Sequence, residues 1–221
     1  MSDVLCFVNH LLERAQRLAR SSQFVPAIEL LRDVARFPLS ATRAEQVHRL
    51  LGELYLKVRR YRKAARHLRR ALARAPRTAR YHYLLGRCVA LHPRGRRENA
   101  LKHFRRALQL QPNHRRCQAE AGLLAVRLGR VSYGLRLLRR AAQGEPRLVG
   151  KLVRGYCEAG RPEAARRAVQ LARFAAPRCP QLLQLQHRLQ YGQLRGQQAQ
   201  RTARAAGAPV VLPFLYLRHV D

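Results

Sequence analysis

Apolar residues recur every three or four positions along most of the chain, which is the period of an amphipathic α-helix. Ala64, Leu68 and Ala71, for example, follow the i, i+4, i+7 spacing of a buried helical stripe. Earlier in the chain, Leu51 and Tyr55 are one helical turn apart and so share a face. The pattern therefore predicts an all-α fold in which each helix buries one side.

Prolines interrupt this helical pattern at regular intervals. Pro76, Pro112 and Pro146 are each followed by a polar residue, and they are 36 and 34 residues apart. Because a proline cannot continue a helix, each one is expected to separate two neighbouring helical segments. Thr42 and Glu45 have the Thr-x-x-Glu spacing of a capping box, which predicts that they start the first helix of this region.

Small residues recur in register with the prolines. Each segment has a glycine in its first half, then a small residue, a large apolar residue and an alanine in its second half, and finally the proline. A glycine in the first helix would let the second helix of a hairpin approach closely. The three sets are Gly52, Ala64, Leu68, Ala71 and Pro76; Gly86, Ala100, Phe104, Ala107 and Pro112; and Gly122, Gly134, Leu138, Ala141 and Pro146.

This order, with its period of 34 residues, resembles the tetratricopeptide repeat (TPR). The resemblance implies a right-handed α-solenoid of about five stacked helix–turn–helix repeats that ends in a C-terminal capping helix. Clear repeats are expected at 45–78, 79–114 and 115–148, and the second of them carries a two-residue insertion. Degenerate repeats are expected at 8–38 and 149–180.

The C-terminal region departs from the repeat pattern. Residues 181–203 place their leucines on one face and glutamines elsewhere, which suits a capping helix with one solvent-exposed face. The solenoid is therefore expected to span 1–203. Residues 204–221 form a tail, and its apolar stretch VVLPFLYL either packs back on the last helices or serves as a linear segment for a partner.

The charge balance adds a second constraint. The 221 residues contain 45 Lys and Arg but only 12 Asp and Glu, which gives a formal net charge of +33, and only four of the bases are lysines. Codon bias and function explain the preference for arginine equally well. A field of this strength attracts polyanions of every kind, so acidic partners are expected.

Part of this charge follows the repeat period. The strings LRRAL, FRRAL and LRRAA recur in the second helix of each clear repeat, and a further base stands just before each string. Residues three and four apart share a helix face, so stacked repeats would align these bases into a basic ridge on the convex side. A plain solvated face is the simpler interpretation, and a polyanion-binding surface is the alternative. The basic ridge comprises Arg66, Arg69, Arg70, Lys102, Arg105, Arg106, Arg136, Arg139 and Arg140.

The resemblance to TPR proteins also implies a concave groove, lined by first-helix residues, that holds an extended or helical peptide. Six bases against one acid in this groove suit an acidic or carboxylate-bearing ligand, because guanidinium groups pair bidentately with carboxylates. Glu53 would repel the carboxylate of a chaperone-tail ligand, which disfavours that ligand class. The groove candidates are Arg49, Glu53, Lys57, Arg80, Tyr83, Arg87, Arg116, Leu123 and Arg127.

No catalytic or metal-binding motif accompanies the repeats. The patterns HExxH, GxSxG and GxxxxGK[ST] do not occur, and the acids are few and dispersed, so the chain is expected to be non-enzymatic and to need no cofactor. His48 and His82 are equivalent in neighbouring repeats, as are His67 and His103. Equivalent side chains on packed helices are about 10 Å apart, which is too far to share a zinc ion.

Other features of the sequence concern its cellular setting. Five scattered cysteines without CxxC spacing argue for reduced thiols, and a cytoplasmic location is expected. The N-terminal residues lack the basic leader of a secretory signal. No apolar stretch approaches the roughly 20 residues that a membrane helix requires.

Three functions are compatible with these patterns. The preferred one is a non-enzymatic protein–protein interaction scaffold or adaptor that binds an acidic peptide or protein in the concave groove. The alternative is a sequence-tolerant RNA- or nucleic-acid-associated protein that uses the basic ridge. A third is peripheral association with anionic membranes through the same ridge. The oligomeric state is left open.

Overall fold

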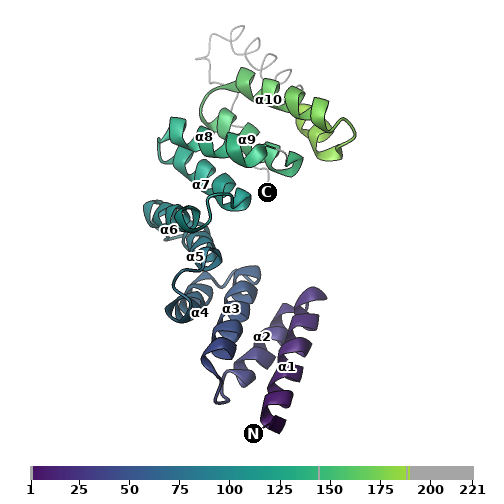
Figure 1. The fold of residues 1–221 in the computed structure, drawn as a ribbon. Coiled ribbons are helices and arrows are strands. Elements are labelled where there is room, and N and C mark those ends of the chain that lie inside the picture. Colours follow the sequence, from purple (N-terminus) through teal and green to yellow (C-terminus); the bar gives the residue numbers. More distant parts are fainter. Residues whose placement is uncertain (1, 144, 188, 190–221) are drawn as a thin grey trace, which may run out of the picture. The chain divides into compact units, whose positions relative to one another are not determined.

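In the computed structural model, which describes residues 2–143, 145–187 and 189, every regular element is an α-helix (Figure 1). The all-α class expected from the sequence is therefore confirmed for this part of the chain. Short turns join consecutive helices into hairpins. The chain divides into two compact units, which are Met1–His114 (unit 1) and Arg115–Asp221 (unit 2).

Unit 1 contains three helical hairpins. Each helix packs against the next one along the chain, and α3 also contacts α5. Because the hairpins follow one another with short connections, α2 and α4 each lie between their own partner and the first helix of the next hairpin. The helices are α1 (Ser2–Arg20) and α2 (Phe24–Val34), α3 (Ala41–Lys57) and α4 (Tyr61–Arg74), and α5 (Ala79–Leu91) and α6 (Arg97–Leu110).

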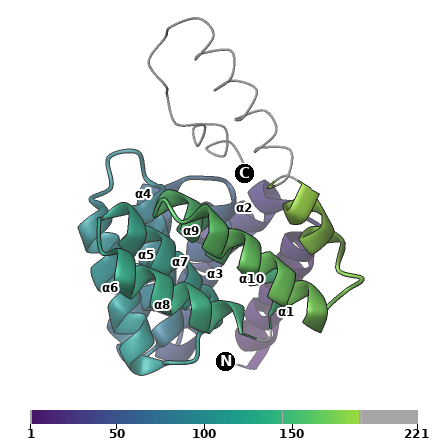
Figure 2. The same ribbon diagram turned by 90° about the horizontal axis from the view of Figure 1, so that it is seen from above.

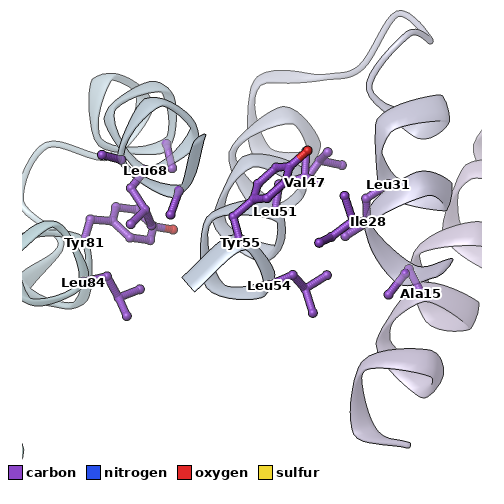
Figure 3. Close-up of a cluster of buried hydrophobic side chains, with 14 of the residues drawn as sticks. Ala15, Ile28, Leu31, Val47, Leu51, Leu54, Tyr55, Leu68, Tyr81 and Leu84 are labelled. Atoms are coloured by element: carbon purple, nitrogen blue, oxygen red, sulfur yellow. The ribbon is translucent and has the colours of Figure 1, made fainter. Parts of the chain in front are cut away.

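The core of unit 1 is a continuous cluster of aliphatic and tyrosine side chains (Figure 3). Leu31 of α2 is 1% exposed, and Leu51 of α3 and Leu68 of α4 are fully buried, so this cluster links one hairpin to the next. Ala64 and Ala71 are also fully buried on the same face of α4 as Leu68. The buried stripe predicted from the spacing of these three residues is confirmed.

Glycine sets the distance between the two helices of a hairpin in unit 1. A β-carbon on Gly52 would lie 2.6 Å from Cγ of Leu68, and one on Gly86 would lie 2.6 Å from Cε1 of Phe104. The large side chain of the second helix thus occupies the space that any other residue in the first helix would fill. The close approach expected from the sequence is present in the α3–α4 hairpin and in the α5–α6 hairpin.

The turns between paired helices share one backbone conformation in four of the five described hairpins, the exception being the turn between α5 and α6. The values of φ are 61° at Ser22, 58° at Arg59, 78° at Gly129 and 68° at Gly160. In each of these four turns, the amide that follows this residue donates to the carbonyl five positions earlier, which is the 6→1 bond of a Schellman motif. The repeat pattern did not predict this left-handed position, which is glycine in unit 2 and a residue with a side chain in unit 1.

The start of α3 differs from the sequence expectation. The residue that caps it is Ser40, whose hydroxyl accepts a hydrogen bond from the amide of Arg43. Thr42 already lies inside the helix, where its hydroxyl is 3.1 Å from that of Ser40. The predicted capping box of Thr42 and Glu45 was therefore wrong by two positions, because Ser40 stands in front of Thr42 and reaches the free amides of the first turn.

Unit 2 begins with two further hairpins. Pro146 and Pro162 occupy the first turns of their helices, where the missing amide donor has no cost. Within this unit, α8 and α9 pack together, α7 also contacts α9, and α9 packs on α10 (Figures 1 and 2). The helices are α7 (Arg115–Arg127) and α8 (Val131–Ala142), and α9 (Pro146–Glu158) and α10 (Pro162–Ala175).

A further helical stretch, 180–187, packs on the second hairpin of unit 2. Its Leu182 is fully buried against Val153 and Val169, and Leu185 is partly buried in the same cluster. This stretch lies at the start of the expected capping helix. The remainder of that helix and the tail 204–221 lie outside the described residues.

Candidate binding surfaces

The predicted groove residues of unit 1 lie on α3 and α5, and an ion-pair bridge joins these two helices. Oε1 of Glu53 is 2.9 Å from Nη2 of Arg80 and 3.5 Å from Nη1 of Arg49. Glu53 therefore does not stand as an isolated negative charge, as the sequence suggested. It is held by two guanidinium groups, and the three side chains together carry a net positive charge.

An aromatic group adjoins this bridge on α5. The guanidinium carbon of Arg87 lies 5.9 Å from the centre of the Tyr83 ring, within the range of a cation–π contact. The same ring is 4.8 Å from the ring of His114 and 6.1 Å from that of Phe104. Tyr83 is thereby fixed by neighbours while remaining partly exposed. Lys57, at the C-terminal end of α3, is exposed.

One predicted groove residue of unit 2, Arg127, also forms an ion pair between first helices. Arg127 of α7 binds Glu158 of α9 bidentately, with Nη2–Oε1 at 2.8 Å and Nε–Oε2 at 3.1 Å. The hydrogen bonds from Arg127 to Glu158 raise the pKa of this guanidinium. Lys151 of α9 pairs in the reverse direction with Glu120 of α7. Each of these pairs links one hairpin to the next, as Glu53 and Arg80 do in unit 1.

One predicted groove residue is not available to a ligand. Leu123 is only 7% exposed, because it belongs to a core cluster with Val126, Leu138 and Leu152. The groove assignment of Leu123 was therefore wrong. Its side chain points from α7 into the space between α8 and α9, whereas Arg116 on the same helix is exposed.

The basic ridge has a different character from the groove. All nine of its side chains are exposed, on α4 and α6 in unit 1 and on α8 in unit 2. Leaving Arg140 aside, none of them forms an ion pair with an acid in the part of the chain that the structure describes. Arg106 donates to the amide oxygen of Gln109 at 3.1 Å, and Arg136 lies over the ring of Tyr133. The charge of the ridge is therefore available to solutes, whereas much of the charge in the groove is paired.

Four histidines pair within hairpins, which was not predicted from the sequence. Nδ1 of His48 lies 3.3 Å from Nδ1 of His67, and the rings of His82 and His103 are 6.1 Å apart. The sequence contains a pattern that indicates this pairing, since His48 and His82 each stand one helical turn before the repeated glycine. His67 and His103 each precede the large residue that contacts that glycine.

Burial keeps these histidines neutral. It lowers the pKa of His67 to about 4, and the positive charges of Arg66 and Arg70 act in the same direction. Burial likewise lowers the pKa of His48, His82 and His103. Within the described ranges, no group of three or more His, Cys, Asp or Glu side chains is arranged to hold a metal ion.

A small pocket lies where the α2–α3 connection meets the start of α3 and the end of α4. Its volume is about 190 Å³. The imidazole of His48 and the guanidinium of Arg74 line it together with five apolar residues. No repeat position marks this pocket, so the sequence pattern did not predict it. The other lining residues are Ala35, Phe37, Leu39, Ala44 and Val47.

None of the helices in the described residues combines the length and the apolar character needed to cross a membrane.

Comparison with known proteins gives one family match and several structural matches. Residues 49–115 match the family model described as tetratricopeptide repeat. No curated protein matches the chain in sequence.

Among solved structures, the fold is similar to TTC0263, described as a thermophilic TPR protein in Thermus thermophilus (TM-score 0.63, 21% identity, 85% of this chain and 99% of that one). It is also similar to the MamA protein (TM-score 0.61, 16% identity, 75% and 90%). A third match is YrrB, described as a TPR protein with an unusual peptide-binding site (TM-score 0.58, 16% identity, 79% and 89%). The fold expected from the repeat pattern is thereby confirmed.

Proposed function

Because this chain is a tetratricopeptide repeat protein, we propose that it is a protein-interaction scaffold that binds an acidic segment of a partner along α3 and α5 of unit 1. The coarser part of this statement, a TPR scaffold of the kind that mediates protein–protein contacts, agrees with the family match. The acidic character of the partner and the residues that contact it belong to the proposal.

The observation that supports an acidic ligand is the bridge centred on Glu53. One carboxylate shared by two guanidinium groups leaves donors unused, since each guanidinium has five N–H groups. The side chain of Arg80 is 58% exposed and can pair with a second carboxylate without leaving Glu53. An incoming acid would thus meet an arginine that is already oriented, which lowers the entropy lost on binding.

Two neighbours extend this site. Tyr83, held by His114 and Phe104, offers a ring edge to an apolar side chain of the ligand, and Arg87 lies over that ring as a second cation. Lys57 adds a third cation at the exposed end of α3. An acidic segment with an interspersed apolar residue matches this combination of charges and an aromatic face.

The test compares two double charge reversals of equal size. Arg80→Glu with Arg87→Glu removes two cations of the groove, and Arg69→Glu with Arg105→Glu removes two cations of the basic ridge. For a labelled glutamate-rich peptide measured by fluorescence anisotropy, we expect the groove variant to bind at least about tenfold more weakly. The ridge variant should lose much less affinity for the peptide. Equal losses in the two variants would show that the peptide responds to net charge alone, and unchanged binding in the groove variant would refute the site.

A second candidate function is supported by the exposed charge of the basic ridge. If the ridge binds nucleic acid, it contacts the phosphates and does not recognise the base sequence, because no motif for base stacking or base recognition accompanies it. RNA affinity should then fall steeply with salt, and the ridge variant should lose it while the groove variant keeps it. An affinity that barely changes between low and physiological salt would exclude this function.

The proposal also includes a cytoplasmic, non-enzymatic role. All five cysteines are free thiols, and Cys88 and Cys117 are buried. Burial raises the pKa of both thiols to about 12, so they are packing groups and poor nucleophiles. Reduced, buried thiols support a protein that works in a reducing compartment.

A further inference from the structure

The pocket beside His48 and Arg74 lies next to the connection between the first two hairpins. This connection, 35–40, has six residues, whereas the connection 75–78 between the next two hairpins has four. The space beside the longer connection has a volume of about 190 Å³. No residue of the predicted groove or of the basic ridge lines it, so the pocket is separate from both binding surfaces described above.

The charged side chain of the pocket is suited to an anion. Arg74 and His48 are the ionisable residues in its lining, and no acid is among the lining residues. Nη1 of Arg74 donates to the backbone carbonyl of Arg70 at 3.1 Å, which orients the guanidinium and leaves four of its five N–H donors for other acceptors. Arg74 forms no ion pair with an acid in the part of the chain that the structure describes. An oriented, unpaired guanidinium is a strong partner for a carboxylate.

The imidazole of His48 adds a second polar group. Its Nδ1 lies 3.3 Å from Nδ1 of His67, so Nε2 is the ring nitrogen that remains for a ligand. When the proton between the two rings belongs to His67, neutral His48 carries its own proton on Nε2 and donates from that atom. The positive charges of Arg74 and Arg70 lie close enough to lower the pKa of His48, after the larger effect of burial. A bound anion would offset these two charges, since the lining residues include no acid.

The other five lining residues are apolar, and contacts with α1 hold two of their surroundings in place. The ring of Phe37 meets that of Phe7 edge to face, with the ring centres 6.2 Å apart. Nε of Arg43, the residue before Ala44, donates to Oδ1 of Asn9 at 3.2 Å. A ligand body without polar groups suits these side chains, because a polar body would lose water without gaining a hydrogen bond from them. The five residues are Ala35, Phe37, Leu39, Ala44 and Val47.

We propose that this pocket binds a small aliphatic monocarboxylate. The carboxylate pairs with the guanidinium of Arg74 and accepts a hydrogen bond from Nε2 of His48, and the aliphatic tail lies against the five apolar residues. The volume is below the roughly 300–1,000 Å³ of ordinary ligand pockets, which limits the tail to a few carbons. The carboxyl end of a peptide fits less well, because the lining includes no side-chain oxygen to accept its amide N–H.

The first test measures saturable binding of acetate, butyrate, hexanoate and hexan-1-ol to the full-length protein by isothermal titration calorimetry at constant ionic strength. Each buried CH₂ should tighten binding about fourfold, so affinity should increase from acetate to butyrate to hexanoate. Hexan-1-ol has the same tail without the charge, and it should bind at least about tenfold more weakly than hexanoate.

The second test uses variants that separate charge from space. Arg74→Gln should weaken hexanoate binding at least about tenfold, because it removes the guanidinium. Arg77→Gln is the matched control, since Arg77 is exposed, lies outside the pocket and changes the net charge equally. Ala44→Leu should weaken hexanoate binding to a similar extent by filling the space without any change of charge. Far-ultraviolet circular dichroism establishes that the helices of each variant remain folded.

Four results would overturn the proposal. An affinity that does not increase with chain length, or equal losses in Arg74→Gln and Arg77→Gln, would show that the protein responds to anionic charge alone. Undiminished hexanoate binding in Ala44→Leu would place the ligand elsewhere. Tighter binding of N-acetylleucine than of hexanoate would identify the occupant as a peptide terminus. A chain-length series that is lost in Arg74→Gln and Ala44→Leu but kept in Arg77→Gln supports a monocarboxylate in this pocket.

Discussion

Gly122 and Gly134 face each other where α7 crosses α8, and neither has room for a side chain. A β-carbon on Gly134 would lie 2.6 Å from the carbonyl oxygen of Gly122, and one on Gly122 would lie 2.9 Å from the carbonyl oxygen of Gly134. The equivalent second-helix positions in unit 1 are Ala64 and Ala100. In the α7–α8 hairpin, backbone thus meets backbone.

We expect Gly134→Ala to destabilise the protein by about 1–3 kcal/mol, because the added methyl group collides with backbone that cannot rotate away. This cost exceeds the gain of about 1 kcal/mol that alanine brings to a helix interior. Gly150→Ala in α9 is the control, since its β-carbon would meet only Cδ1 of Leu185 at 3.6 Å. Urea unfolding should show a lower midpoint for Gly134→Ala and a slightly higher one for Gly150→Ala. A stabilised Gly134→Ala would mean that the two helices can separate at little cost.

The turn after α3 offers a stabilising substitution. Arg59 has φ of 58°, a left-handed conformation that Gly129 and Gly160 adopt at the equivalent turns of unit 2. Arg59→Gly should raise the free energy of unfolding by about 0.5–1 kcal/mol, because it removes the steric penalty of a side chain at this position. The greater entropy of glycine in the unfolded chain offsets part of this gain. Gly129→Ala should lower stability by a similar amount. Thermal melts of the two variants would test the pair, and shifts in the same direction would contradict this explanation.

Contacts that repeat with the period were predictable from the sequence. Gly52 and Leu68 recur as Gly86 and Phe104, so their meeting across a hairpin could be inferred before the structure was known. The cap of α3 could not be assigned from spacing alone, because Ser40 and Thr42 both stand at the end of a possible loop and only the backbone geometry selects Ser40.

The candidate binding surfaces were less predictable than the fold. Glu53 pairs with Arg80 across two hairpins, and that contact depends on the rotation between successive repeats, which sequence spacing does not specify. Leu123 was assigned to the groove by its position in the repeat, but its apolar side chain is buried with Leu152 of the next hairpin. The exposed ridge, by contrast, followed from the charge pattern, since no acid stood one turn from its arginines.

The buried histidine pair predicts a loss of stability in mild acid. The pKa of His67 is about 4 in the folded protein and 6.5 in the unfolded chain, so between these values the unfolded state binds more protons. Stability is therefore full above pH 6.5 and falls as the pH is lowered toward 4, by an amount on the order of 3 kcal/mol at most. Urea unfolding from pH 4 to pH 8 measures this loss.

The variant His67→Phe removes the titrating group while keeping an aromatic ring beside Tyr55. It should have a lower stability at neutral pH, because the hydrogen bond to His48 is lost, but a flatter dependence on pH below 6.5. Parallel pH profiles for the variant and the parent would assign the acid sensitivity to another group.

The Glu53 bridge gives a prediction in which binding and stability move in opposite directions. Glu53→Gln keeps an oxygen acceptor for Arg49 and Arg80 but removes the negative charge between them. Because the side chains are partly exposed, we expect the loss of stability to stay below about 1 kcal/mol. Affinity for the glutamate-rich peptide should rise several-fold at low salt, since two guanidinium groups become available to the ligand. This gain in affinity should vanish near 1 M salt, where the screening length is about 3 Å.

Glu120→Gln is the matched control, because it changes the net charge equally but releases Lys151 in unit 2. If the two variants gain affinity equally, the peptide responds to the overall field of the protein, and the site on α3 and α5 must be abandoned.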